Sequence, residues 1–67
     1  MTQKEKILWH LKTHGHIDTA TAITEYWITR LSEMIRLLRE DGHEIFSEWV
    51  SKGDKRWVQY RLVVRNA

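Results

Sequence analysis

Apolar residues recur at helical spacing from the start of the chain. Ile7, Leu8 and Leu11 share one face if this stretch is helical. Thr2 followed by Glu5 is a capping-box pattern, which is typical of a helix that begins directly after Thr2. The two signals together predict a first helix over residues 3–13.

A short connector separates this helix from a second one. Gly15 can take the left-handed backbone conformation that commonly ends a helix. Residues 16–18 are too few for more than an extended connector or a strand of a single bridge. Asp18 or Thr19 can then cap a helix over residues 19–26. Its apolar face consists of Ala22, Ile23 and Tyr26.

A longer third helix is predicted over residues 30–41, with Thr29 as its N-cap and Gly42 after its end. Its apolar residues repeat at the spacing of one helix face, so we expect them to be buried. They are Leu31, Ile35 and Leu38, with Met34 alongside. The opposite side is polar and carries Arg30, Ser32, Glu33, Arg36 and Glu40.

After Gly42 the period of the pattern changes to two. Residues 43–50 and 57–64 are rich in aromatic and β-branched side chains and flank a polar loop, residues 51–56, that contains glycine. Such runs predict a β-hairpin over residues 43–64. Ile45 and Trp49 of the first strand are expected to face the helices. In the second strand, Val58, Tyr60, Leu62 and Val64 share one face, and Trp57, Gln59, Arg61 and Val63 share the other.

This order of elements predicts an α+β fold, a winged helix-turn-helix in which a three-helix bundle is followed by a β-hairpin wing. With 67 residues, the chain is expected to form a single domain over residues 1–67. It has no cysteine, which excludes disulfides and thiolate zinc sites and fits a reducing compartment. It has neither an apolar run of about 20 residues nor a signal-peptide pattern, so we expect a cytoplasmic protein.

The positive charge is concentrated near the C-terminal end. The net charge of the chain is only +2, but residues 52–65 carry five basic residues against one acid, a net +4, so the remainder carries −2. The basic residues are Lys52, Lys55, Arg56, Arg61 and Arg65. A basic stripe in one element is the pattern expected of a surface that contacts phosphates.

The sequence resembles the small winged helix-turn-helix domains that are common in bacteriophage and prophage proteins. The resemblance rests on QKEKILWHLKTHGHIDTATAI at residues 3–23 and on TRLSEMIRLLREDGHEI at residues 29–45. Its most specific part is IRLLREDGHEI at residues 35–45. The positions that match are Ile7, Leu8, Leu11, Gly15, Ile17, Ala22, Leu31, Ile35, Leu38, Arg39, Gly42 and Ile45, followed by Tyr60 and Leu62. Trp27 departs from the pattern, because such proteins often have a small residue at this turn and a positive φ would strain tryptophan.

Such a fold implies that the third helix enters the major groove of DNA, where side chains near its N-terminus read base edges. Arg30 or Arg36 would pair with guanine, and Glu33 would accept from a cytosine amine or hold an arginine. Thr29 and Ser32 suit phosphate contacts or capping. The alternative is an ordinary solvated face with Glu33–Arg36 pairing.

The predicted wing tip carries Lys52, Lys55 and Arg56, which would reach phosphates or a flanking minor groove. The alternative is a turn that is kept soluble by its charge. Trp9 lies off the apolar stripe of the first helix, and Trp57 lies on the strand face opposite Tyr60. Either tryptophan could belong to the core or could anchor a protein interface.

His10, His14 and His16 are close in sequence, but no fourth ligand is evident, so we expect exposed histidines and no metal. No glycine-rich phosphate loop, nucleophile–base pair or carboxylate pair at a pocket is indicated, so we expect neither an enzyme nor a cofactor.

The leading hypothesis is a sequence-specific transcriptional regulator of phage or prophage type that binds double-stranded DNA, as a homodimer or a cooperative multimer. One alternative is an architectural, excisionase-like factor that bends DNA. Another is a winged helix that binds a protein through Trp9, Trp57 and the Glu44/Glu48 pair. No membrane or small-molecule partner is expected.

Overall fold

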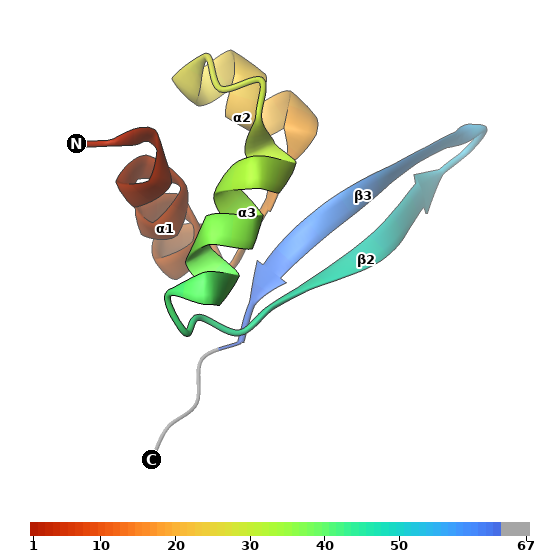
Figure 1. Cartoon of the computed structure of the whole chain (residues 1–67). Coiled ribbons are helices and arrows are strands. Elements are labelled where there is room, and N and C mark those ends of the chain that lie inside the picture. The colour runs from red at the N-terminus through yellow and green to blue at the C-terminus, as the bar shows by residue number, and fades with distance from the viewer. Residues whose placement is uncertain (64–67) are drawn as a thin grey trace.

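The structure, a computed structural model, describes residues 1–63. Val64 of the predicted second strand and Arg65 of the basic segment lie outside these residues. The elements are α1 (Gln3–His14), β1 (His16–Asp18), α2 (Thr19–Tyr26), α3 (Leu31–Glu40), β2 (Ile45–Lys52) and β3 (Lys55–Leu62). Figure 1 shows the helices packed against one another, while the far end of the β2–β3 hairpin projects away from them. The winged helix-turn-helix fold expected from the sequence is confirmed.

Capping interactions set the bounds of α1. The Thr2 hydroxyl accepts from the Glu5 backbone N–H at 3.1 Å, and the Glu5 carboxylate accepts from the Thr2 backbone N–H, so the predicted capping box is present. At the other end, Gly15 has φ 87° and donates its N–H to the Leu11 carbonyl at 2.8 Å. The helix ends at His14, one residue later than predicted.

Residues 16–18 form more than the single bridge expected of them. They make the strand β1, which pairs with β3 in antiparallel register through His16–Arg61, Ile17–Tyr60 and Asp18–Gln59. The sheet therefore has three strands in the order β1-β3-β2 across the described residues. Pairing of β1 also fixes the chain where Ile17 enters the core.

The segment from α2 to α3 differs from the prediction in detail. Asp18 caps α2 by accepting from the Thr21 N–H at 2.7 Å. Ile23 was expected on the buried face but is exposed, and Ile28 in the following turn is buried instead. Thr29 is not the N-cap of α3, because Arg30 takes that position, without a side-chain hydrogen bond to the first turn. The helix is one residue shorter at each end than the predicted 30–41.

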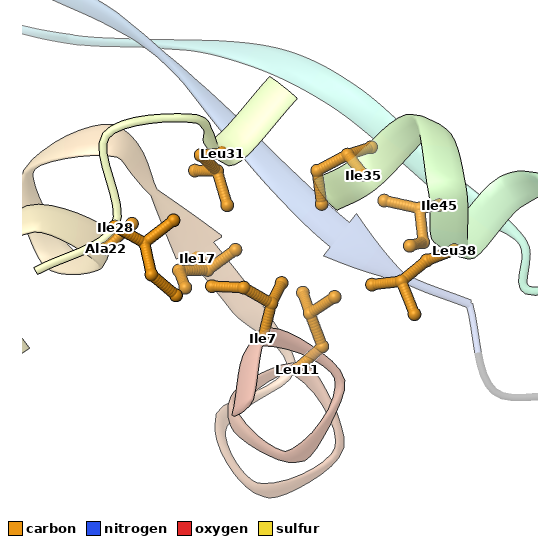
Figure 2. Close-up of a cluster of buried hydrophobic side chains, with 9 residues drawn as sticks. All are labelled: Ile7, Leu11, Ile17, Ala22, Ile28, Leu31, Ile35, Leu38 and Ile45. Carbon is orange, nitrogen blue, oxygen red and sulfur yellow. The ribbon is translucent and has the colours of Figure 1, made fainter. Parts of the chain in front are cut away.

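The core is formed where the three helices meet the base of the sheet. Leu31, Ile35 and Leu38 of α3 are buried, as their spacing predicts. They gather with side chains of α1, β1, α2 and β2 in one cluster (Figure 2). Its other members are Ile7, Leu11, Ile17, Ala22, Ile28 and Ile45. Full burial of one such side chain contributes about 1.5–3 kcal/mol, so this cluster is the main stabilising contact of the fold.

The hairpin turn is tighter than predicted. Lys52 pairs with Lys55, so only Gly53 and Asp54 form the loop rather than residues 51–56. Gly53 has φ 62°, the conformation that the first position of a tight two-residue hairpin loop requires. Because of this turn, the two strands stay paired to the end of the wing.

The prediction that Trp49 faces the helices is wrong. Trp49 pairs with Val58 and lies on the same sheet face as Ile45. Ile45 is buried, but Trp49 is 74% exposed. The reason is that the hairpin extends past the helices (Figure 1), so no helix covers the far part of this face.

The turn between α2 and α3 holds a strained residue. Trp27 has φ 58°, and among residues 1–63 it is the sole residue other than glycine with positive φ. Its backbone N–H bonds to the last turn of α2, but its side chain is 85% exposed and packs little. The strain expected from the sequence is therefore present and is not offset by burial of the indole.

Replacing Trp27 with glycine should stabilise the protein. Left-handed backbone disfavours a residue with a Cβ by roughly 1–2 kcal/mol, so Trp27→Gly should raise the free energy of unfolding by about 1 kcal/mol, measured by urea denaturation. Trp27→Ala removes the same indole but keeps a Cβ, and it should change this free energy much less. Equal stability of the two variants would show that the turn stores no strain.

Candidate nucleic-acid interface

Helix α3 presents a polar face to solvent because its apolar stripe is buried. Ser32, Glu33 and Arg36 are exposed, and so are Thr29 and Arg30 just before the helix. The structure thus brings together the five residues of the predicted recognition surface around the first two turns of α3.

The two arginines of this surface differ in how they are held. Arg36 donates to Glu33 through Nε and Nη2 and to Glu40 through Nη1 at 2.7 Å. The hydrogen bond from Arg36 lowers the pKa of the Glu33 carboxyl, and the same bond raises the pKa of Arg36. The side chain of Arg30 makes no hydrogen bond or ion pair with any residue in the range 1–63, although its charge also helps to lower the pKa of Glu33. Arg30 is therefore the arginine of this face that a ligand can engage without displacing a carboxylate.

The start of α3 offers backbone donors as well. Among residues 1–63, no side chain accepts a hydrogen bond from the backbone N–H groups of the first turn of α3. The first N–H groups of a helix have no partner within the helix, and they carry the positive end of the helix dipole. An anion next to Arg30 would therefore meet both a cationic side chain and unpaired N–H groups.

The wing tip is basic and fully exposed. Lys52 and Lys55 are paired directly across the hairpin, and Arg56 follows in β3 opposite Ser51. Like charges at paired positions repel one another, so this arrangement disfavours the isolated hairpin. The acidic residue nearest to these three basic residues in the sequence is Asp54, in the turn. An anionic partner would relieve the repulsion.

Hydrogen bonds near the base of the wing fix it to α3. Arg39 Nε donates to the Ile45 carbonyl at 2.9 Å, and the His43 N–H donates to the Leu38 carbonyl at 3.1 Å. Leu62 of β3 donates its N–H to the Gly15 carbonyl at 3.2 Å. Arg39 thus positions the wing, a role that its place in the sequence pattern did not reveal.

Arg61, which contributed to the predicted basic stripe, does not join the tip. Its Nη2 lies 3.1 Å from Glu48 Oε1, and its Nε also donates to that carboxylate. Gln59 donates to the same oxygen at 3.2 Å. Within the described part of the hairpin, the positive charge available for a ligand is therefore concentrated at Lys52, Lys55 and Arg56.

The prediction of exposed histidines holds for His14 and His16 but is wrong for His10. His10 is buried between α1 and α2, and its Nδ1 lies 2.7 Å from the Tyr26 hydroxyl oxygen. The ring centroid of His14 is 4.4 Å from that of His10. Burial lowers the pKa of His10, and the nearby His14 and His16 lower it further, against the opposite effect of two acidic side chains. Over residues 1–63 no three histidine or acidic side chains are placed to hold a metal ion.

The two tryptophans singled out from the sequence lie in different surroundings. Trp9 is 53% exposed on α1. Trp57 is partly buried beside Asp18, Thr19 and Ala20, and its Nε1 is enclosed without a hydrogen-bond partner among the described residues. Trp9 is thus the better exposed of the two for contact with another molecule.

Comparison with known proteins agrees with this geometry. A family model described as a winged helix-turn-helix domain matches residues 2–64, nearly the whole chain. No curated protein and no solved structure matches the chain significantly. Within residues 1–63, each helix is too short or too polar to span a bilayer.

Loss of the Arg39 contact should loosen the wing. Arg39→Met leaves the Ile45 carbonyl without its donor, so the free energy of unfolding should fall by about 1 kcal/mol. Amide hydrogen exchange at the start of β2 should become faster. Arg36→Met removes an arginine that bonds only within α3, and it should leave the exchange of β2 unchanged. Equal exchange in all three proteins would contradict the positioning role of Arg39.

Acid should destabilise the protein through His10. The folded-state pKa of His10 is below its usual 6.5, so the folded protein favours the neutral imidazole. The stability that depends on a neutral His10 is therefore complete above pH 6.5 and is lost as the pH falls through the folded-state pKa. Urea denaturation between pH 7.5 and 5 should show a smaller loss of stability in His10→Gln than in wild type. His43→Gln, at a histidine outside α1 and β1, is the control and should behave as wild type. The same pH dependence in His10→Gln and wild type would exclude His10 as its source.

Proposed function

The chain belongs to the winged helix-turn-helix family, and from that premise we propose that it is a sequence-specific DNA-binding protein. Domains of this family typically bind double-stranded DNA and are not enzymes. In the proposed complex, α3 lies in the major groove and the wing lies along the adjacent backbone.

The observation that carries this proposal is the exposed and unpaired Arg30 at the start of α3. A guanidinium can donate two parallel hydrogen bonds to O6 and N7 of guanine, the commonest specific contact in the major groove. The free N–H groups of the first turn suit a neighbouring phosphate, as do the hydroxyls of Thr29 and Ser32. Arg30 would thus read a base while its neighbours fix the register of the helix.

Glu33 and Arg36 would have a secondary part. Their ion pair, extended to Glu40, leaves the middle of α3 nearly neutral. Glu33 can accept from a cytosine amine, and Arg36 can reach a base or phosphate only by exchanging its carboxylate partners. Base recognition would therefore depend first on Arg30.

The wing would supply affinity rather than specificity. Lys52, Lys55 and Arg56 would contact phosphates, which releases counterions and makes binding sensitive to salt. Phosphate contacts carry no direct sequence information, so the wing would strengthen binding to any duplex.

We propose transcriptional regulation in the cytoplasm as the use of this activity. The resemblance to phage and prophage domains supports that role. One module of this size makes few contacts, so two or more copies on neighbouring sites would be needed for useful specificity.

A second candidate function is binding of a protein instead of DNA. The observation that favours it is the balance of charge on α3, where Glu33 and Glu40 bond the arginine between them. Exposed Trp9 would anchor such a partner. The test below separates the two functions.

The DNA proposal predicts separate effects of α3 and the wing. Duplexes enriched from a random pool should bind the protein in fluorescence anisotropy. Arg30→Ala should weaken binding to the enriched sequence by about tenfold or more but leave random duplex nearly unaffected. The triple variant Lys52→Ala/Lys55→Ala/Arg56→Ala should weaken both and reduce the slope of log affinity against log salt by about 3.

Lys6→Ala on α1 is the matched control for loss of a positive charge, and it should bind like wild type. If no duplex is enriched, or if wild type does not bind DNA at low salt, the protein-binding function replaces the DNA proposal.

A further inference from the structure

The outward side of α1 carries an apolar strip that the proposed DNA surface does not use and that touches the core only through Leu8. Trp9 is 53% exposed, Leu8 is half-buried and Met1 is exposed. Together with Glu5 and Lys12 they line a hollow of about 250 Å³. A tryptophan that stands beside an apolar hollow on an open surface is the combination found where another molecule packs.

The charges at the two ends of this strip are arranged symmetrically. The midpoint between Leu8 and Trp9 is also the midpoint between Glu5 and Lys12 in the sequence. The two charged residues are seven positions apart, close to two helical turns, so they lie on one line along α1 and roughly 10 Å apart. A rotation by half a turn about the midpoint exchanges the acidic end of the strip with its basic end.

We infer that α1 pairs with α1 of a second copy of the chain, antiparallel and around a two-fold axis at this midpoint. Glu5 of each copy then faces Lys12 of the other, and Trp9 of each copy packs against the hollow beside Leu8 of the other. A parallel pair would instead put glutamate opposite glutamate and lysine opposite lysine. The strip is therefore complementary to itself in one orientation, as a two-fold interface requires.

The apolar side chains and the charges have different parts in this dimer. Exposed ion pairs contribute little to affinity, so burial of Trp9 and Leu8 drives association, while the charges select the antiparallel orientation. One face of a 12-residue helix is smaller than the roughly 800 Å² per partner of a standard interface. The dimer is accordingly weak, with a dissociation constant in the micromolar range or above, and two copies on adjacent DNA sites would strengthen it.

Sedimentation of the full chain without DNA, from about 10 μM to 1 mM, tests the inference. Wild type should show a concentration-dependent dimer, and Trp9→Ala and Lys12→Glu should each raise the dissociation constant at least tenfold. Two matched controls change similar groups elsewhere and should dimerise like wild type. Trp49→Ala removes an exposed tryptophan from the wing, and Lys6→Glu reverses a charge on α1 outside the hollow.

Exchanging the two charges tests whether Glu5 of one copy lies opposite Lys12 of the other. Glu5→Lys and Lys12→Glu alone should each have a dissociation constant at least tenfold above that of wild type, but a mixture of the two should form a heterodimer with an affinity close to that of the wild-type homodimer. The double variant Glu5→Lys/Lys12→Glu should regain the homodimer in the antiparallel orientation. Because Glu5 also belongs to the capping box, circular dichroism must show that the Glu5→Lys variants keep α1. If the Glu5→Lys variants lose α1, Trp9→Ala and Lys12→Glu still test the dimer, because both substitutions leave the capping box intact.

A monomer at every concentration would overturn the inference. So would a dimer that Trp9→Ala and Lys12→Glu leave unchanged, or failure of folded single variants to associate when mixed. These measurements contain no DNA, so their failure is distinct from failure of the proposed function.

Discussion

The burial of one side of α3 determines which surface the molecule offers to a partner. Leu31, Ile35 and Leu38 pack into the cluster that also holds side chains of α1, β1 and β2. A helix cannot rotate while three of its side chains are held in a close-packed core. The same packing therefore fixes the direction of Arg30 and of the polar face, and every proposal about recognition depends on it.

Attachment of the wing is the second constraint. The Arg39 bond to the Ile45 carbonyl joins the end of α3 to β2, and β1 joins β3 to the loop between α1 and α2. The basic tip is thereby held at a set place relative to α3, although it lies far from the core (Figure 1). A fixed spacing between a reading helix and a basic ribbon is what contact with one duplex requires.

Local patterns predicted the helices, the caps of α1 and α2 and the hairpin, because spacing and capping depend on neighbours in sequence, but they placed the N-cap of α3 at Thr29 and not at Arg30. They allowed residues 16–18 at most a strand of a single bridge, because the three pairs of β1 are made with a strand more than 40 positions away. They also placed Trp49 against the helices, since alternation shows which face a residue occupies but not how far the helices extend over that face. The residues proposed for recognition could be named from the sequence, but the pairing of Arg36 with two glutamates and the unpaired side chain of Arg30 needed side-chain positions.

The central claim is that the outward face at the start of α3 and the wing tip contact DNA together. Amide chemical-shift changes on addition of an enriched duplex test it most directly, because they report each residue of the chain separately. The account predicts the largest changes at residues 29–36 and 51–56. Large changes confined to α1, or none at α3, would contradict it.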